Sequence, residues 1–379
     1  MRFPLFKVHI DGSEAMAQIG RVFDSGFINE GEQVTQLTKE LAVELEAENI
    51  ILVNSCTSAL TLALHLAGVG TGDHVVSTAM TCVATNTPIV ASGADIVWAD
   101  VDPENGMVTP LTILEALTPL TKAVVVVAWA GLPPDIRGIA DVCKNRGVAL
   151  ILDAAHAFGA AFAGRPIHEF VDYTCYSFQA IKHFTTGDGG ALVCSDPDKF
   201  RRAKALKWFG LDRDSAKDSH GNWRGQQWDV DIQESGYKFN MNNVAAAIGL
   251  SQLQHVDKII GNHCANAMTY DGLFEHVAAV RHIKRHPDAA STHWVYSMIV
   301  DDEHSRLNRD ALVAALNREG IQAGLVHVPN DNYTAFERFR SNLPGVRVFS
   351  AHQFSLPCGW WLTEDDIFHI ANRVKELTK

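Results

Sequence analysis

The stretch VALILDAAHAFG, residues 148–159, decides the fold class. Its first five residues are all apolar, which is typical of a parallel strand covered by helices on both faces of a sheet. Asp153 ends this run, and in open parallel sheets ligands collect beyond the carboxyl ends of the strands. We therefore expect the Asp153 carboxylate either to face a ligand crevice or to cap a helix that begins at Ala154.

Similar apolar runs alternate with helical stretches from about residue 38 to residue 195, which predicts an α/β fold built on a mostly parallel seven-stranded sheet. The expected strands are Ile50–Val53, His74–Ser77, Asp95–Ala99, Ala123–Trp129, Val148–Asp153, Tyr173–Phe178 and Gly190–Cys194. A helix is expected over Ser58–Ala67, which is dense in helix formers.

The pattern of apolar and polar residues changes in the second half of the chain. Asp212–Gln233 is polar and aperiodic, as in a long surface loop, and a helix is expected over Asn242–Val256. Beyond about residue 260 we expect a strand in HWVYSMIV and helices over Arg309–Glu319 and Glu364–Leu377. The pattern predicts a large domain, residues 1–255, and a smaller α+β domain, residues 256–379, with CGWW (358–361) in a core or interface.

The composition excludes several classes of protein. The chain of 379 residues is 47% hydrophobic and 20% charged, as in globular proteins, and its net charge of −12 disfavours nucleic acid and anionic membranes as partners. Seven cysteines without a C-x-x-C pair indicate reduced thiols, and no metal site is expected. With no signal peptide and no apolar span, we expect a cytoplasmic protein.

Two further motifs carry chemistry. Lys182, in YSFQAIKHFTTGDGG, follows an expected strand, and a lysine buried in a cleft becomes a nucleophile toward carbonyl carbon, although most such lysines are solvated. Thr57 and Ser58, in NSCTSAL, open a helix, where hydroxyls and free N–H groups bind phosphate or simply cap the helix. Ser177 offers one more hydroxyl. An amine, an acid and a phosphate cradle are the set that pyridoxal 5'-phosphate (PLP) requires.

The chain resembles the DegT/StrS-type sugar aminotransferases, which belong to the fold type I (aspartate aminotransferase) superfamily of PLP enzymes. The similar blocks are GFINEGEQV, NSCTSALTLAL, GDHVVSTAMTCVATN, ILDAAHAFGA, YSFQAIKHFTTGDGGALV and GYKFNMNNVAAAIGLSQL. The resemblance implies that Lys182 binds PLP covalently, that Asp153 pairs with its pyridinium nitrogen, and that Ser177, Thr57 and Ser58 bind its phosphate.

The resemblance also implies a homodimer with a shared active site. In this family the segment that reads GYKFN here reaches the neighbouring subunit's site, so Lys238, or less favourably Asn240, would contact the phosphate there. Three blocks depart from the family's pattern. Cys82 replaces an aromatic residue that stacks on PLP, GYKFN replaces GYNYR, and His156 replaces a glutamine, so that it would contact the cofactor's 3-hydroxyl or the substrate, or pack at a helix start.

The implied reaction is amino transfer from L-glutamate to a nucleotide-linked keto-deoxysugar, at C3 or C4, for cell-surface polysaccharide or glycosylated metabolites. The related sugar dehydratases carry histidine in place of the lysine, so Lys182 favours amino transfer, and the neighbouring His183 stays unassigned. A dehydratase, a cyclitol aminotransferase and a non-catalytic PLP-binding regulator are the alternatives. Two polar-aromatic clusters are candidate sugar contacts or packing surfaces, and their members are Trp208, Arg213, His327 and Asn330.

Overall fold

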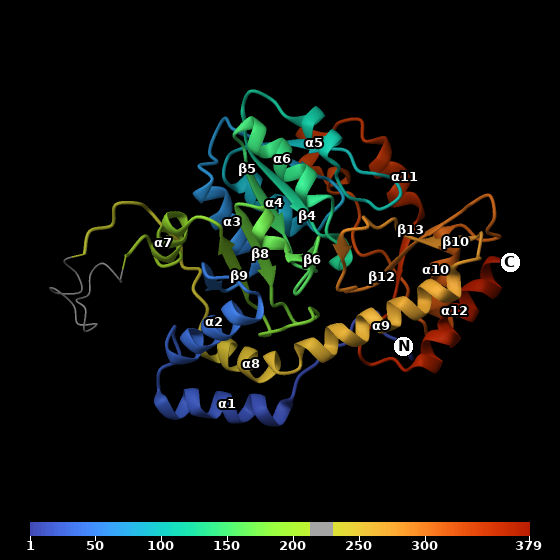
Figure 1. Ribbon diagram of the computed structural model, residues 1–379, viewed down its shortest axis with the longest axis horizontal. Helices are drawn as coiled ribbons and strands as arrows, with labels where there is room; N and C mark the ends of the chain where they lie inside the picture. Colours follow the sequence, from blue (N-terminus) through green and yellow to red (C-terminus); the bar gives the residue numbers. More distant parts are fainter. Residues whose placement is uncertain (213–229) are drawn as a thin grey trace.

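A seven-stranded sheet forms the centre of the computed structural model, which describes residues 1–212 and 230–379 (Figure 1). The strand order is β1-β9-β8-β5-β4-β2-β3, and β9 runs antiparallel to both of its neighbours while the other pairs are parallel. The strands are β1 (Ile50–Val53), β2 (His74–Thr78), β3 (Asp95–Ala99), β4 (Thr121–Val127), β5 (Ala149–Asp153), β8 (Tyr173–Ser177) and β9 (Gly190–Cys194). The predicted fold class and all seven predicted strands are confirmed.

The strand boundaries differ mainly at β4, which was predicted to run to Trp129 but ends at Val127. Trp129–Gly131 form a 3-10 turn, in which Ala130 has a φ of 53°. The residues of this turn are as buried as the strand, and the backbone N–H of Trp294 donates to the carbonyl of Ala130. The apolar run of β4 therefore extends past the end of the strand, because the segment around Trp294 covers the turn that follows.

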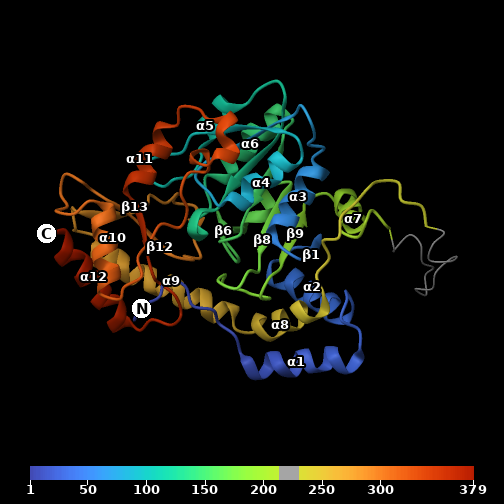
Figure 2. The same cartoon turned by 180° about the vertical axis from the view of Figure 1, so that it is seen from behind.

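Helices cover this sheet on both faces, consistent with the complete burial of strands such as β8 and β9. They are α1 (Gly12–Ser25), α2 (Glu32–Glu44), α3 (Cys56–Leu66), α4 (Val83–Ala91), α5 (Pro110–Ala116), α6 (Ile136–Arg146), α7 (Pro197–Leu206) and α8 (Asn243–Leu253). Helix α3 begins two residues before the predicted start because the Ser55 hydroxyl accepts from the Ser58 N–H and caps it. Figures 1 and 2 show α1 and α8 side by side at one end of the molecule.

The C-terminal part begins with the long helix α9 (Val256–Phe274), which follows α8 after a short break. It contains a three-stranded antiparallel sheet of order β10-β12-β13 and a hydrophobic cluster of its own. Its elements are β10 (Val280–His282), β12 (Tyr296–Val300), α10 (Arg309–Arg318), α11 (Pro344–His352), β13 (Gln353–Leu356) and α12 (Glu364–Thr378). The predicted strand and both predicted helices are present, whereas the domain boundary at residue 255 stays a prediction.

Shorter elements complete the chain. A small sheet of order β11-β6-β7 joins the two parts, because β11 (Ala289–Ala290) pairs with β6 (Ala161–Phe162), which pairs with β7 (Arg165–Pro166). Further 3-10 turns within the described ranges are η2 (Ile167–Phe170), η4 (Asn330–Asn332) and η5 (Thr334–Phe339). All seven cysteines are free. Within residues 1–212 and 230–379, every helix is too short or too polar to cross a bilayer.

The start of α3 lies so close to β9 that a side chain at Gly190 should clash with it. Gly190 pairs with Val53 and Ser177 in the sheet. A Cβ there would lie 2.7 Å from the backbone of Ser55 and Cys56. We expect Gly190→Ala to lower the free energy of unfolding by about 1–3 kcal/mol through overpacking, measured by chemical denaturation. Gly20→Ala in α1 is the control, because nothing lies within 4 Å and alanine favours a helix. Equal effects of the two substitutions would contradict the expected clash.

Candidate active site

A cavity of about 360 Å³ lies beyond the carboxyl ends of the parallel strands. The loops that follow β1, β2, β5 and β8 all contribute to it, because parallel strands end at the same edge of a sheet. The structure thus brings together seven residues that the sequence singled out, namely Thr57, Cys82, Asp153, His156, Ser177, Lys182 and His327. Phe6 and Trp294, which the sequence did not single out, also line the cavity.

Asp153 is the last residue of β5, and only 4% of its surface is exposed. The Thr85 hydroxyl donates to one carboxylate oxygen at 2.7 Å, and the Ala155 N–H donates to the other at 3.0 Å. Burial raises the pKa of Asp153, while these hydrogen bonds and the charge of Lys182 oppose the rise. The carboxylate is thus oriented toward the cavity, where it gains from a positive partner. Thr85 was missed, although it closes the block TCVAT in which Cys82 was noted.

Lys182 lies in the loop that connects β8 to β9. Burial lowers the pKa of its amine to about 8, and the negative charge of Asp153 limits this decrease. Its Nζ lies 3.7 Å from the centroid of the Trp294 ring. A substantial fraction of the amine is therefore neutral near physiological pH, as a nucleophile toward an aldehyde must be.

The N-terminus of α3 supplies the candidate anion site. Ser55 and Thr57 line the cavity, together with the strand residue Ser177. Ser58 does not line it, because its hydroxyl donates to Asn54 Oδ1 at 2.6 Å and its N–H donates to Ser55 Oγ at 3.1 Å. The structure therefore adds Ser55 to the candidate phosphate ligands, whereas both Ser58 donors already have partners in the same segment and its phosphate contact stays a prediction.

Two imidazoles face the cavity from different parts of the chain. His156 and His327 stack with their ring centroids 5.4 Å apart. Burial lowers the pKa of both, that of His327 to about 3, so both rings are neutral at pH 7. His156 Nδ1 and His327 Nε2 are buried without a partner among the described residues, so both can hydrogen-bond a ligand. Cys82 also lines the cavity and leaves more room there than an aromatic side chain.

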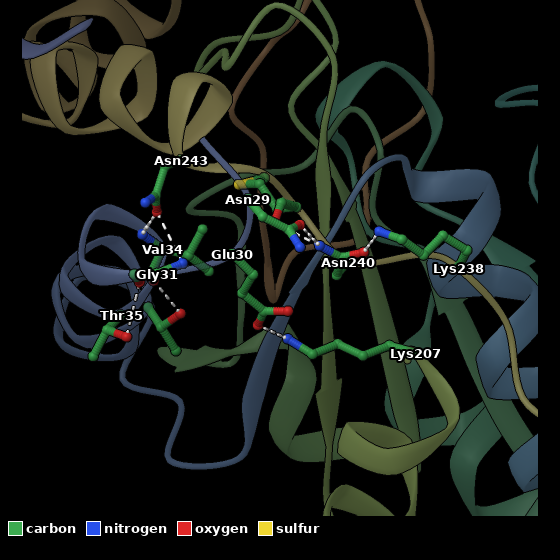
Figure 3. A network of polar contacts seen from close by, with 11 residues as sticks. Asn29, Glu30, Gly31, Val34, Thr35, Lys207, Lys238, Asn240 and Asn243 are labelled. Atoms are coloured by element: carbon green, nitrogen blue, oxygen red, sulfur yellow. Dashed lines mark hydrogen bonds and ion pairs between the residues drawn. The ribbon is translucent and has the colours of Figure 1, made fainter. Parts of the chain in front are cut away.

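Lys238 and Asn240, the expected phosphate ligands of a neighbouring subunit, do not line the cavity of their own chain. Figure 3 shows the Lys238 amine bonded to Asn240 Oδ1, while Asn240 Nδ2 donates to Asn29 Oδ1 at 3.2 Å. Lys238 Nζ also lies 4.0 Å from the centroid of the Trp208 ring. Trp208 therefore packs beneath Lys238, which is a role that the sequence did not predict.

The same network fixes the loop around Asn29 (Figure 3). Asn243 Oδ1 accepts from the N–H groups of Gly31 and Val34, and Asn243 Nδ2 donates to the carbonyl of Phe27. Glu30 forms an ion pair with Lys207, just after α7. Segments that lie about 210 residues apart in sequence are thus joined into one unit beside Lys238.

The remaining predicted site residues lie elsewhere. Asn330 is buried, accepts from Asn86 Nδ2 at 2.8 Å and donates to the carbonyl of Thr81 at 2.7 Å, so it supports the loop before Cys82 and does not face the cavity. Arg213 and most of the predicted polar loop lie outside the described residues. His183 points away from the cavity and packs against His263.

The C-terminal motif CGWW packs against the N-terminal segment, where Trp361 Nε1 donates to the carbonyl of Pro4 at 3.2 Å. No group of three or more His, Cys, Asp or Glu side chains able to hold a metal ion occurs within residues 1–212 and 230–379.

These residues fit PLP. The amine of Lys182 suits its aldehyde, the Asp153 carboxylate suits its pyridine nitrogen, and the N-terminus of α3 suits its phosphate. The unpartnered Nδ1 of His156 offers a hydrogen bond to a ring substituent. The fold and the site together define a PLP-dependent enzyme of fold type I.

Comparison with known proteins gives the family. The model of the DegT/DnrJ/EryC1/StrS aminotransferase family matches residues 9–375, and the chain belongs to this family. It is therefore a PLP-dependent aminotransferase. It is 29% identical to the spore coat polysaccharide biosynthesis protein SpsC of Bacillus subtilis (strain 168), over 99% of this chain and 97% of that protein.

Two crystal structures are similar over nearly their whole length. AtS13 from Actinomadura melliaura is 34% identical, with a TM-score of 0.90 over 99% of this chain and 98% of that one. The sugar aminotransferase CalS13 from Micromonospora echinospora is 32% identical, with a TM-score of 0.90 over 99% of both chains.

The pKa of Lys182 makes a prediction that needs no substrate. In protein freed of cofactor, acetylation of Lys182 by a trace amount of acetic anhydride, followed by mass spectrometry across pH, should have its midpoint near pH 8. Because burial disfavours the ammonium form, reactivity should rise through this pH, whereas ordinary lysines titrate at about 10.4. The exposed lysines of the same sample are the control, and a midpoint shared with them would contradict burial of the amine.

Proposed function

We propose that this aminotransferase moves an amino group from L-glutamate to the keto group of a nucleotide-linked keto-deoxysugar, at C3 or C4, in the biosynthesis of cell-surface polysaccharide or glycosylated metabolites. The observation that carries the proposal is the presence of the Lys182 amine and the Asp153 carboxylate in one buried cavity. The description of SpsC as a polysaccharide biosynthesis protein and of CalS13 as a sugar aminotransferase support a sugar acceptor. We place the reaction in the cytoplasm, where seven free thiols are stable.

The side chains divide the work of this reaction. Bound PLP supplies an electron sink for the negative charge that develops at the α-carbon of the amino donor. Lys182 would hold the cofactor between turnovers, and its free amine would take a proton from the donor's α-carbon and return it. Asp153 would hold a proton on the ring nitrogen of the cofactor, and the hydrogen bond from the Thr85 hydroxyl fixes the carboxylate for that role.

The half-reaction with glutamate tests the proposal. Purified protein with PLP should absorb visible light, borohydride should attach the cofactor to Lys182, and L-glutamate should bleach the band with release of 2-oxoglutarate. Lys182→Ala should lower the bleaching rate at least about a hundredfold because proton transfer is lost. Binding of PLP without glutamate-dependent bleaching would instead indicate a regulatory protein.

The acceptor is tested on the amine-charged protein from the same experiment. Nucleotide-linked 3-keto and 4-keto sugars, the corresponding free sugars and a keto-cyclitol are offered in turn, and return of the visible band reports transfer. Preference for a nucleotide-linked sugar supports the proposal, and preference for the cyclitol overturns it. A keto-deoxy product that contains no new amine would indicate a dehydratase.

We infer that the functional unit is a homodimer in which Lys238 contacts the cofactor phosphate of the neighbouring subunit. Three features support this arrangement. Lys238 does not line its own cavity. Phe27 and Ile28, beside its network, are exposed apolar side chains. A hollow of about 660 Å³ is lined by Ile28 and by Asp188, which also lines the active-site cavity, so a second chain seated there would lie next to the cofactor.

Subunit mixing tests the shared site. Lys182→Ala and Lys238→Ala subunits, unfolded and refolded together, form mixed dimers in which one site carries both defects and the other carries none. Random pairing should therefore restore activity at about one quarter of all sites, above the activity of either variant alone. Lys182→Ala mixed with Asp153→Asn is the control, because both residues line the same cavity and each mixed site keeps one defect. Equal recovery in both mixtures would exclude contact across the interface.

A further inference from the structure

Trp294 lies at the wall of the cavity, two residues before β12, and only 4% of its surface is exposed. It therefore comes from the C-terminal part of the chain, whereas Lys182 lies in a loop of the seven-stranded sheet and Asp153 ends its strand β5. Its backbone N–H donates to the carbonyl of Ala130 at 2.9 Å, which fixes the main chain at this position.

The Trp294 side chain contacts the lysine segment twice. Its indole Nε1–H donates to the carbonyl of Ile181 at 2.8 Å, one residue before the lysine. Its ring lies 3.7 Å, centroid to Nζ, from the Lys182 amine, within the range in which the negative face of an aromatic ring attracts a cation. One side chain thus holds both the backbone and the amine of the reactive residue.

Stacked rings hold the indole itself in place. Phe6, from the N-terminal segment, stacks on Trp294 with centroids 4.6 Å apart, and His156 stacks on it at 3.9 Å with an angle of 19° between the planes. Rotation of the indole would break both contacts as well as the hydrogen bond to Ile181. The ring is therefore a rigid surface for the amine.

Few charged groups near Lys182 stabilise the ammonium form of its amine, so an aromatic ring beside the amine can contribute to that stabilisation. The titratable groups whose charge would act on the amine are Asp153, Cys56, Cys82, His156, His183 and His327. The three imidazoles are neutral near pH 7, since burial lowers the pKa of each. Apart from Asp153, the groups that favour the ammonium form are the thiols of Cys56 and Cys82, and burial raises the pKa of the Cys56 thiol.

We propose that Trp294 is a positioning residue for Lys182, whose ring stabilises the ammonium form of the amine while its N–H fixes the adjacent main chain. When the amine of Lys182 is free, it would rest on this ring. The role of Trp294 in catalysis rests on the proposed amino transfer. The contact between Trp294 and Lys182 needs no cofactor, so it can be tested in cofactor-free protein.

The test titrates Lys182 in cofactor-free protein by trace acetylation. Replacing all eight tryptophans with 5-fluorotryptophan weakens the attraction of each ring for a cation and keeps the shape of the ring and its N–H. We expect the midpoint of Lys182 acetylation to fall by about half a pH unit, because the ammonium form loses stabilisation. Trp294→Phe should also lower the midpoint of Lys182 acetylation. Incorporating 5-fluorotryptophan into the Trp294→Phe variant should then leave this midpoint unchanged.

The hydrogen bond is tested by hydrogen exchange. Trp294→Phe should speed amide exchange in residues 179–184, because the donor to the Ile181 carbonyl is lost. Trp98→Phe is the matched control, since Trp98 is buried beside Phe336 and its indole nitrogen has no partner among the described residues. This control should change neither the exchange nor the Lys182 midpoint. An unchanged midpoint in the fluorinated protein would overturn the role of the ring, whatever the outcome of the glutamate experiment.

Discussion

The shared burial of an acid and an amine is the constraint on which the site depends. A carboxylate inside a protein is unstable unless hydrogen bonds and a positive charge compensate for lost hydration. Asp153 has the Thr85 hydroxyl, the Ala155 N–H and the Lys182 charge, and the pKa values of acid and amine are displaced in opposite directions by burial. The low polarity of the site favours the neutral, nucleophilic amine of Lys182. It also makes the Asp153 carboxylate depend on a nearby positive charge for its stability.

The fold satisfies this constraint by convergence of chain segments. The loops after β1, β2, β5 and β8 meet because the strands run in parallel, so residues from position 55 to position 182 reach one cavity without a long excursion of the chain. The C-terminal part then contributes Trp294 and His327 to the wall of the cavity. Each part alone would leave the amine and the acid more hydrated, and the pKa of each would move toward its ordinary value.

The sequence was most informative where one local pattern dictates one structure. Continuous apolar runs such as that before Asp153 predicted the strands, and Asp153 and Lys182 were singled out because each lies at or just beyond the end of such a run. Hydrogen bonds between residues far apart in sequence leave no such local pattern. The bonds of Asn330 to Asn86 and Thr81, and of Trp294 to Ile181, join residues over a hundred positions apart, so their packing roles were invisible. The sequence also does not tell which of two serines caps a helix, and the phosphate contact of Ser58 stays a prediction.

The reversal of β9 has a consequence for how this enzyme can change. Lys182 lies on a connection between two adjacent strands, β8 and β9, so both ends of its loop are fixed by neighbouring hydrogen-bonded pairs. Residues can be inserted into such a loop, or removed from it, without altering the order of strands. The position of the amine can therefore change through its own loop while the acid at the end of β5 stays where it is.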